Sequence, residues 1–175
     1  MGIQPAPSDD AGSPDVAVLV RQAQHGDALA MHDLLVLLGP YVGRLCGPIA
    51  LQNGADAAQE ALIAVFRGIR QLKEPAALFG WVRAIAVREA LRVVARSGRV
   101  VAAELAEAPA PGDAELSADV RDVLQRLSPE HRAVLVLRDL EGLDEQSVAA
   151  VLSLPVGTVR SRLFRARRSF REAWR

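Results

Sequence analysis

The chain of 175 residues has few of the residue types from which disulfides and metal centres are built. Cys46 is the only cysteine, so it has no partner for an intramolecular disulfide and belongs to no zinc-ligand spacing. The three histidines, His25, His32 and His131, are scattered and lie near no acid cluster with metal spacing. We therefore expect no metal site, and we interpret the histidines as surface or packing residues.

Catalytic motifs and targeting segments are missing as well. The sequence offers no nucleophile–base pair, no phosphate-cradling glycine loop and no paired carboxylates in an apolar setting. We therefore expect no catalytic residues, no cofactor and no enzymatic activity. No apolar run approaches membrane-spanning length, and residues 1–5 do not have the pattern of a signal peptide. A soluble, cytoplasmic protein with no membrane partner is expected.

Lysine is almost absent, because Lys73 is the only lysine among 21 basic residues. This bias toward arginine indicates a GC-rich coding sequence and says little about mechanism. The basic residues balance 21 acidic ones, but the balance is not local. The carboxyl end is strongly basic, while acids collect at Asp9, Asp10, Glu104, Glu107, Asp113 and Glu115. Such charge asymmetry points to a nucleic-acid partner.

The fold class predicted from periodicity is all-α. Half of the residues are apolar, which is enough for a sizeable core, and no strand-like alternation interrupts their helical spacing. We expect two small helical domains joined by a flexible linker, the C-terminal one a four-helix helix-turn-helix domain. The predicted bounds are a disordered tail at 1–14, a first domain at 15–98, a Pro-rich linker at 99–113 and a second domain at 114–175.

Turn residues divide the first domain into helices. Breaks are predicted at Gly26-Asp27, at Gly39-Pro40 and at Gln52-Asn53-Gly54, so that a separate helix starts near Tyr41. A long helix then runs from Ala55 toward Leu72 and is ended by Lys73-Glu74-Pro75. Its predicted apolar stripe consists of Leu62, Val65, Phe66 and Ile69.

The helix predicted from about Leu78 to Arg96 has two different faces. Its apolar face consists of Val82, Ala86, Ala90 and Val93. The arginines Arg88, Arg92, Arg96 and Arg99 have the same spacing and are rotated away from it. A row of guanidiniums can follow a phosphate backbone, although a solubilising face is the alternative. Trp81, near the start of this helix, is interpreted as core.

The end of the chain, from Leu143 to Trp174, has the pattern of a helix-turn-helix, and a further helix precedes it. Ser128-Pro129 predicts a helix start and Glu141-Gly142 a helix stop. Asp144 is a good N-cap for a short helix to Leu152, and Ser153-Leu154-Pro155 is the break. The following helix has an apolar stripe at Val159, Leu163, Ala166 and Phe170. Two helices joined by a tight turn, the second of them basic, are typical of a DNA-reading motif.

Charge on this last helix separates DNA contact from a merely solvated face. Arginines stand at positions 160, 162, 165, 167, 168, 171 and 175, against the single acid Glu172. A solvated surface helix would alternate the two signs. The pattern therefore favours contact with a polyanion.

These residues resemble the extracytoplasmic-function branch of the sigma-70 sigma factors, the bacterial RNA polymerase specificity subunits. The specific segments are Leu127–Glu130, Glu141-Gly142, Pro155–Leu163 and Arg165–Arg167, and the organisation matches over about residues 15–175. The resemblance implies a first domain that binds the polymerase clamp helices and the −10 element. It implies a second domain that reads the −35 element and meets the polymerase flap, and an anti-sigma factor that wedges between the domains. It also implies a cytoplasmic, nucleoid-associated protein.

The resemblance assigns roles to particular positions. For the −35 element these are Thr158, Arg160, Ser161, Arg162, Phe164, Arg165 and Arg168; for the −10 element, Arg88, Arg92 and Arg96; for the polymerase, Asp56, Gln59 and Glu60. The chemistry agrees for the −35 set, because arginine is a bidentate donor to guanine and a phenyl ring can lie against a thymine methyl. The loop Lys73 to Ala77 resembles the pocket for a flipped base.

Several positions depart from the family pattern. Residues 53–60 carry fewer acids than the usual clamp-facing motif, and Ser153 replaces the usual turn glycine. Arg88 and Arg92 stand where the family has Asn and Asp. Because guanidinium cannot accept a hydrogen bond, this change favours phosphate binding over base reading at the −10 element.

Two other function classes remain open at this point. A stand-alone helix-turn-helix regulator with a helical sensor or dimerisation domain would explain the last helix, but it would need neither the clamp-like segment nor a second arginine face. A helical scaffold that binds only protein would leave both arginine faces unexplained.

Overall fold

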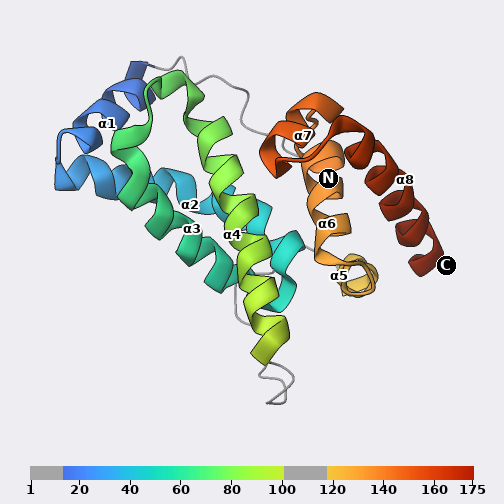
Figure 1. Cartoon of the computed structure of the whole chain (residues 1–175). Helices are drawn as coiled ribbons and strands as arrows, with labels where there is room; N and C mark the ends of the chain where they lie inside the picture. The colour runs from blue at the N-terminus through green and yellow to red at the C-terminus, as the bar shows by residue number, and fades with distance from the viewer. Residues whose placement is uncertain (1–13, 101–117) are drawn as a thin grey trace.

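The computed structural model describes residues 14–100 and 118–175, and in these ranges every regular element is helical (Figure 1). The all-α prediction is confirmed. The first helical unit (residues 14–100) contains α1 (Pro14–Gln24), α2 (Ala28–Ala50), η1 (Leu51–Asn53), α3 (Gly54–Gly68), η2 (Ile69–Gln71), η3 (Pro75–Ala77) and α4 (Leu78–Val100). The second helical unit (residues 118–175) contains α5 (Ala118–Gln125), α6 (Pro129–Leu135), the π-helical turn η4 (Val136–Leu140), α7 (Glu145–Leu152) and α8 (Val156–Ala173).

The break predicted at Gly39-Pro40 is wrong, because α2 continues through Pro40 and Pro48 to Ala50. Proline has no N–H, so Pro40 leaves the carbonyl of Val36 without its helical partner. Val36 is 61% exposed, so water can reach that turn. The opposite side of α2 buries Leu34, Leu38 and Leu45, and this burial outweighs the lost hydrogen bond.

The continuous α2 also corrects the expectation about apolar runs. The stretch Ala28–Gln71 is long and apolar enough to cross a membrane by length and composition alone. In the fold, 56% of its most apolar window is buried inside the protein. The apolar character of α2 is therefore explained by its place between α1, α3 and α4, where core residues cover it.

Two faces of α4 are placed as predicted. Val82, Ala86, Ala90 and Val93 are fully buried against α2 and α3. The arginines Arg88, Arg92 and Arg96 are exposed on the other side. The helix runs to Val100, so the first two positions of the predicted linker are helical. The tail at 1–13 and positions 101–113 of the linker lie outside the described residues.

The helix ends of the second unit follow the expected capping chemistry. The Ser128 hydroxyl accepts from the His131 N–H, and Pro129 takes the first helical position of α6. The Asp144 carboxylate accepts from the Ser147 N–H at 2.7 Å at the start of α7. Gly142 precedes α7 with φ +71, a left-handed backbone that glycine adopts without strain.

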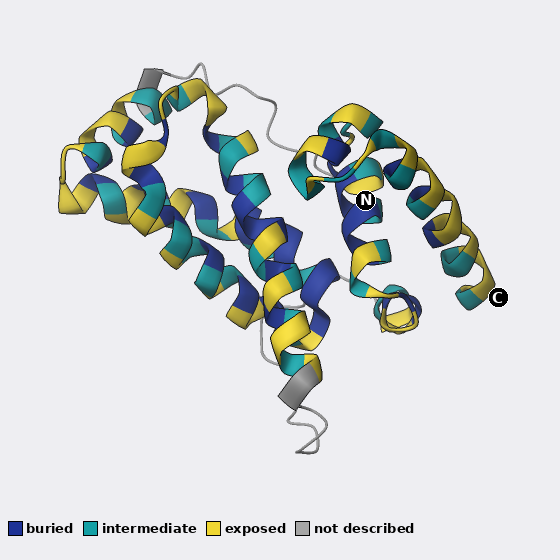
Figure 2. Ribbon diagram, viewed as in Figure 1, coloured by how far each residue is buried: buried dark blue, intermediate teal, exposed yellow. Residues whose placement is uncertain are grey.

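The two units pack against each other rather than standing apart. Helices α2 and α4 of the first unit contact α6, and α4 also contacts α7. One hydrophobic cluster contains buried residues of both units, and Figure 2 marks the buried positions along these helices. Buried Arg132 on α6 donates to the carbonyl of Ile49 on α2 at 2.8 Å. Its other donors reach the carbonyls of Leu124 and Leu127 in its own unit. Burial lowers the pKa of this guanidinium, and these carbonyl contacts satisfy its N–H groups.

Candidate nucleic-acid interface

Helix α8 presents the predicted reading face to solvent. Val159 and Ala166 are fully buried and Leu163 is 4% exposed, so the apolar stripe anchors the helix to its unit. Of the predicted −35 residues, Arg160, Ser161, Phe164, Arg165 and Arg168 are exposed, and Thr158 and Arg162 are partly exposed. Phe164 keeps 67% of its surface exposed. A large aromatic ring held in water among arginines is well placed to meet a base edge.

The arginines of α8 differ in their hydrogen-bond partners. Arg160 donates to Glu145 at 2.5 Å, and Arg168 donates to Glu172 at 2.8 Å. Arg165 donates to the carbonyl of Ser161, one turn earlier in its own helix, at 3.2 Å. The hydrogen bond that Arg160 donates to Glu145 holds the pKa of Arg160 above its ordinary value. Of the two predicted base-reading arginines, Arg160 therefore has an acid to exchange for DNA, whereas the hydrogen bond of Arg165 is to a backbone carbonyl.

The turn before α8 sets the angle at which this face is presented. Ser153 caps α7 in the left-handed conformation, with φ 54 and ψ 46, and its N–H bonds back to Ala149 and Ala150. The N–H of Leu154 then bonds to the carbonyl of Ala149 at 2.9 Å. Serine at this position is strained where glycine would not be. Pro155 serves as the N-cap of α8, one position earlier than the first helical position expected of a proline.

The structure places the predicted −10 residues beside the predicted polymerase residues. Arg92 contacts Glu60 at 3.3 Å, and Arg96 contacts Asp56 at 3.5 Å and Glu60 at 3.8 Å. Arg88 instead donates to the carbonyl of Ala84 in its own helix. All three arginines are exposed, so these ion pairs are at the surface. Sequence reasoning assigned the two sets to different partners and did not anticipate that they touch.

A hollow of about 660 Å³ lies at the loop that was expected to receive a flipped base. It is lined by Gln71, Leu72, Lys73, Glu74, Ala76, Ala77, Gly80, Trp81 and Arg83. Trp81 is partly buried and packs against the core, in line with its interpretation as core, and it also lines this hollow. Its ring lies so close to Gly68 that a Cβ there would be 3.1 Å from the ring. Helix packing thus sets an aromatic face into the wall of the hollow.

An apolar surface on α2 and α3 surrounds Gln59. Leu35, Ala55, Ala58, Gln59, Leu62, Ile63 and Phe66 line a groove of about 490 Å³. Phe66 is 55% exposed, although its spacing predicted that it belonged to the buried stripe. The periodicity argument placed Phe66 in the core because residues at three- and four-residue spacing form a broad stripe on the helix. The core covers only part of that stripe, and Phe66 lies outside the covered part.

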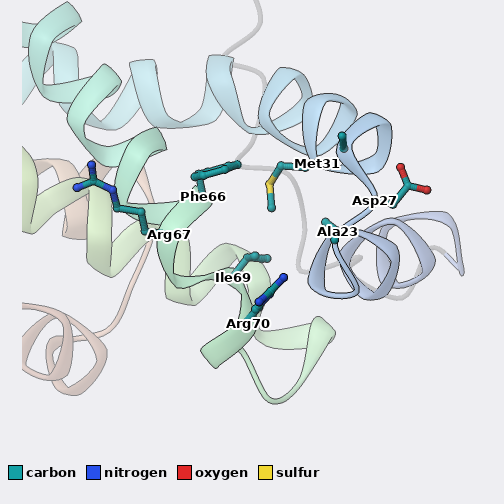
Figure 3. A pocket seen from close by; sticks show the side chains of 9 residues that line it. Ala23, Asp27, Met31, Phe66, Arg67, Ile69 and Arg70 are labelled. Carbon is teal, nitrogen blue, oxygen red and sulfur yellow. The ribbon is translucent and has the colours of Figure 1, made fainter.

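Phe66 also lines a second hollow, of about 460 Å³, at the turn between α1 and α2 (Figure 3). Met31 and Phe66 point toward one another there, and Arg67 and Arg70 lie along its edge. The two hollows therefore have Phe66 in common. Among residues 14–100 and 118–175, no group of three or more His, Cys, Asp or Glu side chains is arranged to hold a metal ion.

Comparisons with known proteins agree with this geometry. A family profile described as sigma-70, region 4 matches residues 117–170. The chain is 36% identical over 179 residues to the RNA polymerase sigma-H factor of Pseudomonas aeruginosa, covering 89% of this chain and 91% of that protein. It is 32% identical over 170 residues to the ECF RNA polymerase sigma-E factor of Escherichia coli strain K12, covering 86% and 89%. This chain belongs to the extracytoplasmic-function sigma factors of the sigma-70 family.

The fold comparison extends over both units of this sigma factor. The sigma factor RpoE from Bartonella quintana, solved in complex with the anti-sigma factor NepR, superposes with a TM-score of 0.62 at 22% identity. The match covers 81% of this chain and 94% of that chain. The match to the sigma-H factor of Pseudomonas aeruginosa covers 89% of this chain, so the sigma-factor similarity includes the first unit as well. The protein is a DNA-binding factor of transcription initiation.

Proposed function

We propose that this sigma factor binds core RNA polymerase and directs it to promoters, with α8 reading the −35 element and α4 handling the −10 element. The observation that supports this most is the exposed set Arg160, Ser161, Phe164 and Arg165, mounted on a buried stripe behind a helix-turn-helix turn. Such a helix fits the major groove, where arginine donates to guanine and a ring packs on a thymine methyl. Thr158, Arg162 and Arg168 flank this set and suit phosphate contacts.

Core polymerase is the partner we assign to the apolar surface of the first unit. Gln59 lies in the groove between α2 and α3, and Asp56 and Glu60 lie one helical turn apart beside it. Exposed Phe66, with Ile63 at 38% exposure, supplies the apolar contact that a stable interface needs. A flanking pair of acids would set the orientation of a basic partner helix.

Promoter opening is proposed to use the hollow between Lys73 and Arg83. Trp81 offers a stacking face and Lys73 and Arg83 offer positive charge for a base turned out of the duplex. Extruding one base takes a few kcal/mol, which binding elsewhere in the complex can supply without a nucleotide cofactor. Arg88, Arg92 and Arg96 would hold the adjacent phosphates.

An anti-sigma factor and the polymerase flap are the other partners proposed. A groove of about 440 Å³ runs between Pro48 of the first unit and α5, α6 and α8 of the second. Leu135, Val136, Leu140 and Phe170 make it strongly apolar. An amphipathic helix would fit it. We place the protein in the cytoplasm, on the nucleoid.

Transcription with purified core polymerase and a promoter library tests this function directly. The combination should start transcripts at a defined subset of promoters, and sigma factor or core alone should not. Charge reversal at both Asp56 and Glu60 should weaken capture of core polymerase, while circular dichroism shows that the helical fold is kept. Unchanged capture would mean that the polymerase surface lies elsewhere. Raising salt should weaken promoter binding, with a slope of about −0.9 per phosphate contacted.

A further inference from the structure

The side chain of Glu141 lies in the interface between the two helical units. It belongs to the second unit, directly after η4, and it is fully buried. Its carboxylate accepts from the Tyr41 hydroxyl at 2.9 Å and from Arg83 Nε at 3.1 Å, and lies 3.6 Å from Arg44 Nη2. Within the described ranges, every polar contact of this carboxylate is with the first unit. Its backbone, in contrast, belongs to its own unit, where its N–H donates to the carbonyl of Val136 at 2.9 Å and ends η4.

The receiving site on the first unit is held in place by its own contacts. Arg44 lies over the ring of Tyr41 at 5.4 Å, and Tyr41 packs edge-on against Phe79, also at 5.4 Å. Burial raises the pKa of the Tyr41 hydroxyl, with Glu141 adding to the effect, so the hydroxyl stays a donor. Burial alone would lower the pKa of Arg83, but Tyr41 and Glu141 together hold it above its ordinary value. The first unit therefore offers a positively charged binding site for a single carboxylate.

Arg83 belongs to two sites at once. It holds Glu141 in the interface, and it also lines the hollow beside Trp81 that we assign to an extruded base. While Glu141 is in place, its charge neutralises the cation in the wall of that hollow. An anionic DNA strand would therefore compete with Glu141 for Arg83.

The closed arrangement is also too short to serve both promoter elements. The −35 and −10 elements are named for positions about 25 base pairs apart, which is about 85 Å of B-DNA at ~3.4 Å per step. A closed globule of this length has a radius of gyration of about 16 Å and is about 40 Å across. The faces of α4 and α8 cannot reach both elements until the two units separate.

We propose that Glu141 is an internal latch: its carboxylate, bound by Tyr41, Arg44 and Arg83, keeps the free sigma factor closed and masks Arg83 from single-stranded DNA. The latch opens when polymerase and promoter DNA supply competing contacts. This inference rests on the proposed function, because the masked hollow is the one assigned to the −10 strand. It concerns the free protein, whereas the proposed function concerns the protein with polymerase.

The test compares free wild-type protein with Glu141→Gln and with Glu130→Gln. Glu130 is exposed on α6 and makes none of the interface contacts, so its variant controls for the loss of one negative charge. Small-angle X-ray scattering should show a larger radius of gyration for Glu141→Gln alone. Binding of a fluorescein-labelled 12-nucleotide single-stranded DNA of mixed sequence should tighten roughly tenfold, as expected when a state that leaves about a tenth of the molecules competent is removed.

Two further variants keep the inference testable. Arg83→Ala in the Glu141→Gln background should remove most of the gain in DNA binding, because the unmasked group is then missing. If Glu141→Gln does not fold by circular dichroism, Tyr41→Phe removes one latch hydrogen bond without changing charge and should open the protein partially.

The outcomes separate the latch from the proposed function. Equal scattering for all three proteins, with equal oligonucleotide affinities for the two Gln variants, would overturn the latch. Wild-type protein would in that case still direct promoter-specific transcription with core polymerase. Absence of such transcription from wild-type and Glu141→Gln proteins alike would instead overturn the proposed function.

Discussion

The arginine faces of α4 and α8 are built alike but are occupied differently. Each consists of exposed guanidiniums opposite a buried apolar stripe. On α4, Arg92 and Arg96 are paired with Glu60 and Asp56, which are predicted polymerase contacts. On α8, Arg160 and Arg168 are paired with Glu145 and Glu172, which are not predicted polymerase contacts, and Arg165 bonds to the carbonyl of Ser161 in its own helix.

This difference suggests when each face becomes available to DNA. Exposed ion pairs contribute about 0–1 kcal/mol each, so phosphates can replace the acids on α4 at little cost. Replacement becomes easier once polymerase engages Asp56 and Glu60. The acids paired with Arg160 and Arg168 on α8 are not predicted polymerase contacts, so we expect DNA binding by the predicted −35 face to depend less on polymerase than binding by the predicted −10 face.

The largest effect is predicted for a substitution that removes packing beneath only one of the two faces, that of α8. Leu163→Ala empties a buried position beneath α8 and should lower the free energy of unfolding by about 2–5 kcal/mol. Urea denaturation measures this loss. Binding to duplex promoter DNA should fall, while capture of core polymerase through the first unit should persist. Equal loss of both activities would show that the two faces depend on one cooperative core.

A smaller effect separates base reading from phosphate binding. Arg165→Ala or Arg160→Ala should each weaken promoter binding by about 1–3 kcal/mol, concentrated at one base-pair position of the −35 element. Arg92→Ala should weaken binding to every sequence to a similar extent. Binding to a panel of single-base promoter variants distinguishes the two patterns. A uniform loss for Arg165→Ala would make it another phosphate contact.

The two strained residues of the described chain give a third comparison, of about 1 kcal/mol. Ser153 before α8 and Leu51 after α2 are its non-glycine residues with positive φ. Ser153→Gly should stabilise the protein by about 1 kcal/mol, because glycine adopts the left-handed conformation without strain. Leu51→Gly should instead destabilise it, since Leu51 is 5% exposed and loses its packing. Thermal unfolding should give a higher midpoint temperature for Ser153→Gly and a lower one for Leu51→Gly.

The smallest predicted effect is a pH dependence of stability that is due to His131 in the second unit. Burial lowers the pKa of His131, and the charges of Arg165 and Arg162 lower it further. The unfolded chain therefore binds the proton first, so stability should fall as pH drops through about 6.5 and below. His131→Gln should reduce that fall in denaturation midpoint, and His32→Gln in the first unit is the matched control. A pH dependence unchanged by His131→Gln would exclude this residue as its source.

Local pattern predicted much of the architecture. The buried stripes of α4 and α8, the exposed arginines opposite them and the caps at Ser128 and Asp144 follow from spacing and side-chain chemistry. Helices are the elements for which such reasoning works best, because residues three and four apart share a face. The assignments to −10, −35 and polymerase contacts remain predictions.

The errors came where distant packing overrides a local signal. Pro40 reads as a helix breaker, yet α2 continues because its buried face is held by three neighbouring helices. Phe66 reads as core, yet 55% of its surface is exposed.

The amino-acid order alone was enough to indicate an all-helical chain, two arginine faces and a helix-turn-helix, because each depends on neighbours within a few turns. It could not show that Arg92 and Arg96 pair with Glu60 and Asp56, or that Glu141 is buried against Tyr41, 100 positions away. Those contacts exist because folding brings separate helices together, and no local spacing encodes which charges then meet.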